Sequence, residues 1–170
     1  KPTFRHTSYD GYKAGRQKTE SGLVEQIQAT PKLCEVLSIP VYSCEGFEAD
    51  DLLGTLAEQL KKEEGTRVVI ASGDMDTFQL IEGDKVVVYT LKKGNDAALF
   101  NEKAVVDKYG FLPLQIPDYK GLAGDPSDNI IGIKGVGDKT ATTIIQKYSS
   151  IEAMYETLKK DKNSLIENGF

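Results

Sequence analysis

The chain has 170 residues, of which 39% are hydrophobic and 28% are charged, with a formal net charge of −5. This composition is ordinary for a soluble globular protein, and neither a membrane-spanning apolar run nor a signal peptide is visible. Cys34 and Cys44 are not at a metal-ligand spacing and the lone His6 offers little for zinc, so we expect reduced cysteines in a cytosolic protein.

The charged residues are unevenly distributed along the chain, which the net charge alone does not show. Acid is concentrated in the middle of the chain, whereas both flanks are rich in basic residues. That pattern is expected when a metal site lies between two phosphate-binding ends. The basic residues of the first flank are Lys1, Arg5, Lys13, Arg16 and Lys18, and those of the second are Lys134, Lys139 and Lys147.

The first half of the chain alternates between strand and helix patterns. Residues 1–19 are polar, basic and aromatic without a clear period, which predicts a loop or a weakly helical arm. Apolar spacing or β-branched runs then predict the following elements. They are a helix over Ser21–Leu37, a strand over Ile39–Cys44, a helix over Ala49–Lys62, and strands over Arg67–Ala71 and Val86–Tyr89.

This order predicts an α/β domain with a mainly parallel sheet. No strand candidate follows residue 90, and the later pattern is all helical. Its helices are expected over Glu102–Tyr109, Leu114–Leu122, Lys139–Tyr148 and Ile151–Lys159. We therefore expect a basic arm in residues 1–19, an α/β core in 20–95 and a helical subdomain in 96–170.

Seven carboxylates occur in three short clusters spread over roughly half of the chain. Hard divalent cations such as Mg²⁺ take oxygen ligands, and a pair of such ions is the usual device for cleaving phosphodiesters. If folding brings the clusters together, they form a metal site for two ions. The candidate ligands are Glu48, Asp50, Asp51, Asp74, Asp76, Asp125 and Asp128.

Each cluster also has an ordinary structural interpretation. Acids are favoured in the first turn of a helix, which suits Glu48-Ala-Asp50-Asp51, although three acids there repel one another. Asp74 can cap a turn after the strand that ends at Ala71, and Asp125 and Asp128 lie among turn-forming residues. The metal hypothesis depends on all three clusters occurring in one chain.

A glycine-rich turn, Gly132–Ala141, directly follows the third cluster. Gly135 and Gly137 permit positive φ and close backbone approach, and a turn that opens a helix presents N–H groups to phosphate. Asp138 is expected to cap the helix that begins near Lys139. A plain connection between two helices is the alternative.

These segments closely resemble the 5′–3′ exonuclease domain of bacterial DNA polymerase I, in the flap endonuclease (5′-nuclease) family. The most specific segment is Asp118–Ala141, and the resemblance extends over nearly the whole chain. It implies a PIN-like nuclease core followed by a helix–three-turn–helix DNA-binding motif. It also implies that two strands and two ligand aspartates precede the first residue, so we expect the isolated chain to fold poorly or to lack activity.

The resemblance further implies a magnesium- or manganese-dependent enzyme that uses two or more ions to cleave DNA at 5′ flaps and at nicked or branched duplexes. It matches the seven acids to metal ligands, Lys13 and Arg16 to catalytic contacts with the scissile phosphate, and the Gly132–Gly137 turn to a site that holds K⁺ in some relatives. A polymerase domain in the same parent chain is a further implied partner. The implied DNA-binding residues are Arg5, Lys13, Arg16, Lys134, Gly135, Gly137, Lys139 and Thr140.

Two alternative functions fit parts of the sequence. Asp74-Met-Asp76-Thr77 also fits the Asp-x-Asp-x-Thr signature of haloacid-dehalogenase-type phosphatases, but Ser72-Gly73 separate it from its strand and the stretch before Asp125 has a helical pattern. The more serious alternative is a non-catalytic, structure-selective DNA-binding module that lacks two metal ligands.

Overall fold

The computed structural model describes residues 2–91 and 97–160. Contacts divide the chain into two units, and each unit is described by itself. The first unit comprises residues 1–52 with 126–130, and the second comprises residues 53–125 with 131–170. The predicted boundary at residues 95 and 96 lies outside the described residues.

The first unit is mainly helical. It contains α1 (Phe4–Ser8) and α2 (Ser21–Val36), and α3 (Ala49–Leu60) begins in it. The helices predicted to start at Ser21 and Ala49 are therefore confirmed, the first of them with Pro31 inside. The basic arm forms α1 and then a series of turns, and Lys13 takes a left-handed conformation with φ 58°.

The predicted strand at Ile39–Cys44 is wrong. This segment forms no strand, and Val41 and Tyr42 are 55% and 65% exposed. A strand needs hydrogen bonds from a neighbour, and residues 39–44 pair with no strand in the described part of the chain. The short apolar run does not by itself show whether a neighbouring strand is available.

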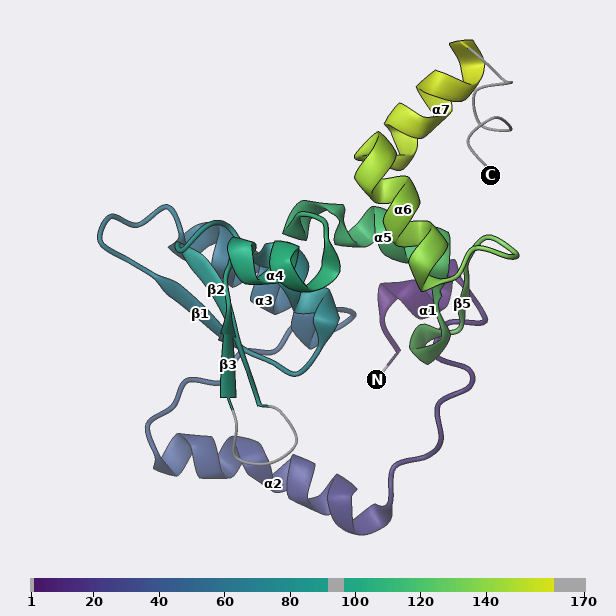
Figure 1. Cartoon of the computed structure of the whole chain (residues 1–170). Coiled ribbons are helices and arrows are strands. Elements are labelled where there is room, and N and C mark those ends of the chain that lie inside the picture. Colours follow the sequence, from purple (N-terminus) through teal and green to yellow (C-terminus); the bar gives the residue numbers. More distant parts are fainter. Residues whose placement is uncertain (1, 92–96, 161–170) are drawn as a thin grey trace. The chain divides into compact units, whose positions relative to one another are not determined.

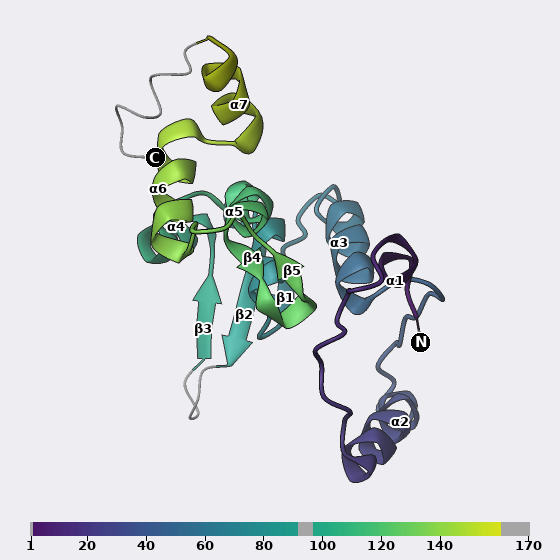
Figure 2. The same cartoon turned by 90° about the vertical axis from the view of Figure 1, so that its right-hand side faces the viewer.

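The second unit contains a three-stranded sheet (Figure 1). Its strands are β1 (Val68–Ala71), β2 (Val86–Leu91) and β3 (Ala97–Phe100), in the order β1-β2-β3. β1 and β2 are parallel, but β2 and β3 are antiparallel, as the opposed arrows in Figure 2 show. The prediction of an α/β fold is confirmed, whereas the mainly parallel sheet is corrected to a small mixed sheet.

The core of the second unit joins the sheet to helices that precede and follow it in the chain. Ile70, Val86 and Val88 are buried there with Ala57 of α3 and with Val105 of α4 (Glu102–Tyr109). Asn101 caps α4 by accepting a hydrogen bond from the Ala104 N–H at 3.0 Å. Between β1 and β2 lies the 3-10 helix η1 (Met75–Leu80), whose Phe78 ring stacks on Phe100.

The C-terminal part of the second unit is mostly helical. It contains η2 (Pro113–Gln115), α5 (Ile116–Ala123), α6 (Asp138–Tyr148) and α7 (Ile151–Lys160), which agree with the predicted helices to within a few residues. α5 packs against α6, and α6 contacts α7. Among the described helices, none is both long and apolar enough to cross a membrane.

The expectation that no strand follows residue 90 is wrong. β3 was missed because Ala97-Ala-Leu-Phe100 is short and contains no β-branched residue, and it becomes a strand only through its antiparallel pairing with β2. Two further strands of two residues each, β4 (Gly124–Asp125) and β5 (Ile130–Ile131), flank the 3-10 helix η3 (Pro126–Asp128). Asp125 and Asp128 therefore lie at the ends of a tight connection.

Candidate metal centre and nucleic-acid interface

In the first unit, the acids at the start of α3 are paired with cations of the basic arm. Arg5 donates two hydrogen bonds of 2.7 Å to the two oxygens of Asp51. The Lys13 ammonium lies 2.8 Å from both carboxylate oxygens of Glu48, and the Tyr12 hydroxyl donates to Glu48 at 2.9 Å. The arm thus carries a counter-ion for each of these two carboxylates.

The start of α3 also shows the ordinary capping role of an acid. Asp51 accepts a hydrogen bond of 2.8 Å from the Glu48 backbone N–H, as the third residue of a capping box does. Asp50 lies in the same first turn. Local helix chemistry therefore accounts for part of this cluster, and the ion pair with Arg5 adds to it.

Lys13 also links Glu48 to the third acidic cluster. Its ammonium lies 3.9 Å from Asp128, and its backbone N–H donates to the Asp128 carbonyl at 3.0 Å. Arg16 pairs with Asp128 at 2.8 Å. Two carboxylates far apart in sequence, Glu48 and Asp128, therefore face one ammonium group. The backbone of Lys13 has a positive φ, which is uncommon for a residue other than glycine.

These pairings lower the pKa values of two carboxylates of the first unit, Asp51 and Glu48. The guanidinium of Arg5 lowers the pKa of Asp51 through its hydrogen bonds. Burial acts to raise the pKa of Glu48, but the hydrogen bonds from Lys13 and Tyr12 outweigh it, so that pKa is lowered. Burial acts to lower the pKa of Lys13, and its pairing with Glu48 raises it. Charged carboxylates are the form that binds a divalent cation.

In the second unit, two acids converge on Lys120 of α5. Its ammonium contacts Asp76 of η1 and lies 2.7 Å from Asp125 of β4. Burial acts to lower the pKa of Lys120, but the two carboxylates raise it. Asp76 and Asp125 therefore face a single positive charge, as ligands of one cation do.

Asp74 has a local structural role. It is the N-cap of η1, where its side chain accepts a hydrogen bond of 2.9 Å from the Asp76 N–H. Its own N–H donates to the Ser72 hydroxyl at 3.0 Å. The capping interpretation of Asp74 is thus confirmed, and it does not preclude a second role as a metal ligand.

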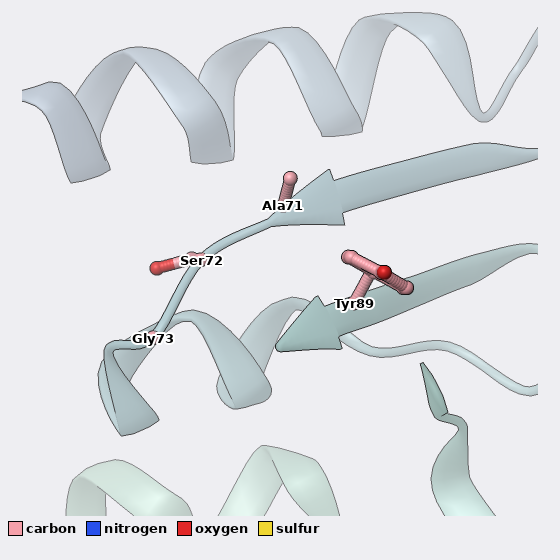
Figure 3. Close-up of a pocket in the computed structure, with 4 residues that line it drawn as sticks. All are labelled: Ala71, Ser72, Gly73 and Tyr89. Carbon is pink, nitrogen blue, oxygen red and sulfur yellow. The ribbon is translucent and has the colours of Figure 1, made fainter. Parts of the chain in front are cut away.

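A small cavity opens beside this turn, at the carboxyl end of β1 (Figure 3). Its volume is about 200 Å³, and Ala71, Ser72, Gly73 and Tyr89 line it. Ligands of open α/β sheets bind outside the carboxyl ends of parallel strands. The sequence singled out the acids after β1 but gave no signal for Tyr89, which reaches this edge through its register with Ala71.

The lysines of the glycine-rich turn, unlike Lys13 and Lys120, have no acidic partners among the described residues. Lys134 and Lys139 are exposed, and neither makes an ion pair within residues 2–91 and 97–160. Gly135 has φ 86°, which favours glycine, but Gly137 has φ −96° and open space around its Cβ position. The expected need for glycine is therefore met at Gly135 and not at Gly137.

Asp138 does not cap α6 as expected. It is the first residue of that helix, and Gly137 is the N-cap, which provides no side-chain hydrogen bond. The Asp138 carboxylate instead accepts a hydrogen bond of 2.9 Å from the Tyr119 hydroxyl. Thr140, the remaining DNA-binding candidate, lies in the first turn of α6.

The donor set fits divalent metal, although no complete centre is formed. Among the described side chains, no three of His, Cys, Asp or Glu lie together as a metal site. Two carboxylate pairs, Glu48 with Asp128 and Asp76 with Asp125, nevertheless each face one ammonium. Their oxygens are the hard donors that Mg²⁺ and Mn²⁺ prefer. That all seven acids hold metal in one site stays a prediction.

Comparison with protein families gives two adjoining matches. Residues 1–110 match the family described as 5′-3′ exonuclease, N-terminal resolvase-like domain. Residues 111–168 match the family described as 5′-3′ exonuclease, C-terminal SAM fold. Together the two matches extend over nearly all of the chain.

Curated relatives include two bacterial proteins named DNA polymerase I. The one from Mycobacterium tuberculosis (strain ATCC 25618 / H37Rv) is 44% identical over 156 residues, which are 92% of this chain and 17% of that protein. The one from Bacillus subtilis (strain 168) is 42% identical over an alignment of 172 positions, which covers 98% of this chain and 19% of that protein. The chain thus spans less than a fifth of the length of these relatives.

Solved structures of bacteriophage T5 proteins share the fold. One was co-crystallised with metal ions and is 25% identical, with a TM-score of 0.75 over 92% of this chain and 61% of that one. Another, a flap endonuclease described as a pseudo-enzyme–product complex with DNA and metal ions, is 24% identical, with a TM-score of 0.76 over 93% of this chain and 60% of that one.

Proposed function

This chain belongs to the 5′-3′ exonuclease family, and we propose that it hydrolyses DNA phosphodiesters at 5′ flaps and at nicked or branched duplexes, with two or more Mg²⁺ or Mn²⁺ ions. The observation that carries the proposal is the convergence of Asp76 and Asp125 on the Lys120 ammonium. These acids come from two separate motifs of the resemblance, and they meet around one positive charge. The relatives crystallised with metal ions and with DNA support the same activity.

Bound metal would activate water and stabilise the attacking and leaving oxygens of the phosphodiester. The residues proposed to hold it are the seven acids, which are Glu48, Asp50, Asp51, Asp74, Asp76, Asp125 and Asp128. Lys13 and Arg16 are proposed to contact the scissile phosphate and to offset its developing negative charge. Both cations pair with acids of the proposed site, so Lys13 and Arg16 would exchange these ion pairs for the phosphate when DNA binds.

The proposal divides the chain by role. Residues 1–19 form the arm that contacts the scissile strand, residues 20–95 carry most of the metal ligands, and residues 96–170 bind the duplex. Arg5 of the arm, and Lys134, Gly135, Gly137, Lys139 and Thr140 of the glycine-rich turn, are proposed to bind DNA. A K⁺ ion at the Gly132–Gly137 turn, and a polymerase domain in the parent chain, are proposed from the family.

The test compares DNA cleavage with DNA binding on labelled 5′-flap, nicked and blunt duplexes. For the protein restored to full length, we expect cleavage of the flap and nicked substrates in Mg²⁺, no cleavage in EDTA, and binding in both. A chain that binds the flap substrate selectively but cleaves nothing in Mg²⁺ or Mn²⁺ is the non-catalytic DNA-binding module. Cleavage that persists in EDTA would contradict the metal-dependent mechanism.

Duplex affinity is expected to depend on salt through the glycine-rich turn. Lys134 and Lys139 are free of acid partners among the described residues, so each is available to neutralise a phosphate. Replacing both with alanine should lower the slope of log affinity against log salt by up to about two units. Binding of unrelated duplex sequences should weaken equally, because phosphate contacts carry no sequence information.

The matched control replaces two exposed lysines that already have acidic partners. Lys103 pairs with Asp107, and Lys159 pairs with Glu156. The variant with Lys103→Ala and Lys159→Ala makes the same change in net charge and should leave the slope close to that of the wild type. If titration gives both double variants the same slope, the glycine-rich turn is only a helix connection.

A further inference from the structure

Asp138 places a negative charge at the start of the helix that is proposed to face phosphate. It is the first residue of α6, and the preceding Gly137 has no side chain with which to cap the first turn. A carboxylate in a first turn is attracted to the same backbone N–H groups that attract a phosphate. A free Asp138 side chain would therefore compete with the DNA backbone.

In the structure, the Asp138 carboxylate is bound to a residue of α5 and not to the N–H groups of α6. Its hydrogen bond is to the Tyr119 hydroxyl, at 2.9 Å. In the described part of the chain, it accepts no hydrogen bond from a backbone N–H of α6. The Ala141 N–H, in the same first turn, donates to the Gly137 carbonyl.

Tyr119 is well fixed for this role. It belongs to α5, and its ring packs against Phe111 with a centroid separation of 5.0 Å. Phe111 in turn contacts Tyr109, which lies against Phe78 in the core of the same unit. Burial and the neighbouring Asp138 raise the pKa of Tyr119 to about 12, so the hydroxyl remains a donor across the physiological range.

We propose that Tyr119 is a positioning residue for DNA binding, which keeps the Asp138 carboxylate away from the first-turn N–H groups of α6 and so leaves them to a backbone phosphate. This inference deepens the proposed function and rests on it. Tyr119 touches no DNA in this account, because it acts through Asp138.

The test is a double-variant cycle on duplex affinity, measured by fluorescence anisotropy with a 5′-flap duplex in EDTA at fixed salt. Tyr119→Phe removes the hydroxyl and releases the carboxylate, and affinity should fall roughly two- to fivefold. Asp138→Asn removes the competing charge and should bind no more weakly than the wild type. The double variant, Tyr119→Phe with Asp138→Asn, should bind like Asp138→Asn alone.

Recovery of duplex affinity when Asp138→Asn is added to Tyr119→Phe distinguishes a positioning role of Tyr119 from a merely structural one. If Tyr119 only supports the packing of α5 on α6, the double variant will stay as weak as Tyr119→Phe, and the inference is overturned. The matched control is Tyr109→Phe, since the Tyr109 hydroxyl makes no hydrogen bond in the described part of the chain. It should bind like the wild type.

Two further outcomes are decisive. If the wild type binds the flap duplex and Tyr119→Phe binds equally well, the inference fails while the proposed function stands. If the wild type does not bind the duplex at all, the proposed function fails and the inference fails with it. Should Tyr119→Phe prove unfolded by circular dichroism, weaker binding by Asp138→Asn than by the wild type would still overturn the inference.

Discussion

Replacing Gly132 with alanine is expected to destabilise the chain by about 3 kcal/mol. A Cβ at this position would lie 2.4 Å from the Ala123 carbonyl carbon and from the Gly124 nitrogen, and 2.5 Å from the Leu122 oxygen. All three are backbone atoms, which cannot swing aside as a flexible side chain does. The backbone would have to separate, and the 2.8 Å hydrogen bond from the Ile133 N–H to the Leu122 carbonyl would be lost with it.

Urea unfolding at neutral pH measures this effect, and Gly137→Ala is the matched control. Gly137 lies in the same turn, but its Cβ position has no atom within 4 Å and its φ is −96°. Alanine there should change the free energy of unfolding by no more than about 0.5 kcal/mol. If both variants lose the same free energy of unfolding, the close approach of the backbone at Gly132 is contradicted.

In the protein restored to full length, Lys13→Ala is expected to lower the turnover number on a flap substrate by about a hundredfold while duplex affinity changes little. The Lys13 ammonium sits between Glu48 and Asp128, two of the proposed metal ligands, so a phosphate bound beside these acids would be within its reach. A charge at that place stabilises the transition state more than the bound duplex, because negative charge increases during attack. Affinity depends instead on many phosphate contacts elsewhere.

Single-turnover cleavage at saturating Mg²⁺, together with anisotropy binding in EDTA, separates the two effects. The control is Lys18→Ala, which removes an exposed lysine of the same arm. It should leave the single-turnover rate near that of the wild type. A parallel fall in rate and affinity for Lys13→Ala would mean that this lysine only binds DNA.

Elements with strong local periodicity were predictable from the sequence, and the pairing of short strands was not. The helices at Ala49, Glu102 and Lys139 carry apolar residues at helical spacing, and the structure contains all three. Ile39–Cys44 has the composition of a strand but no partner in the described part, whereas Ala97–Phe100 contains no β-branched residue and becomes a strand by pairing with β2.

The acids themselves were predictable because their spacing is a motif, but their counter-ions were not. Lys120 lies in the most specific segment of the resemblance, yet nothing in its spacing shows that it joins Asp76 to Asp125. Arg5 was expected to meet DNA, and the structure gives it a bidentate pair with Asp51. The partner of Asp138 was also unexpected, because Tyr119 reaches it only when α5 packs against α6.

The most direct test of the metal-dependent nuclease account is the rate of flap cleavage as a function of Mg²⁺ concentration for the wild type and for Asp125→Asn. The control is Asp107→Asn, which removes an exposed acid of α4 that pairs only with Lys103 among the described side chains. The account predicts Mg²⁺-dependent cleavage by the wild type and the control, and loss of cleavage with retained duplex binding in Asp125→Asn. Cleavage by Asp125→Asn at the wild-type rate and the same Mg²⁺ requirement would contradict it.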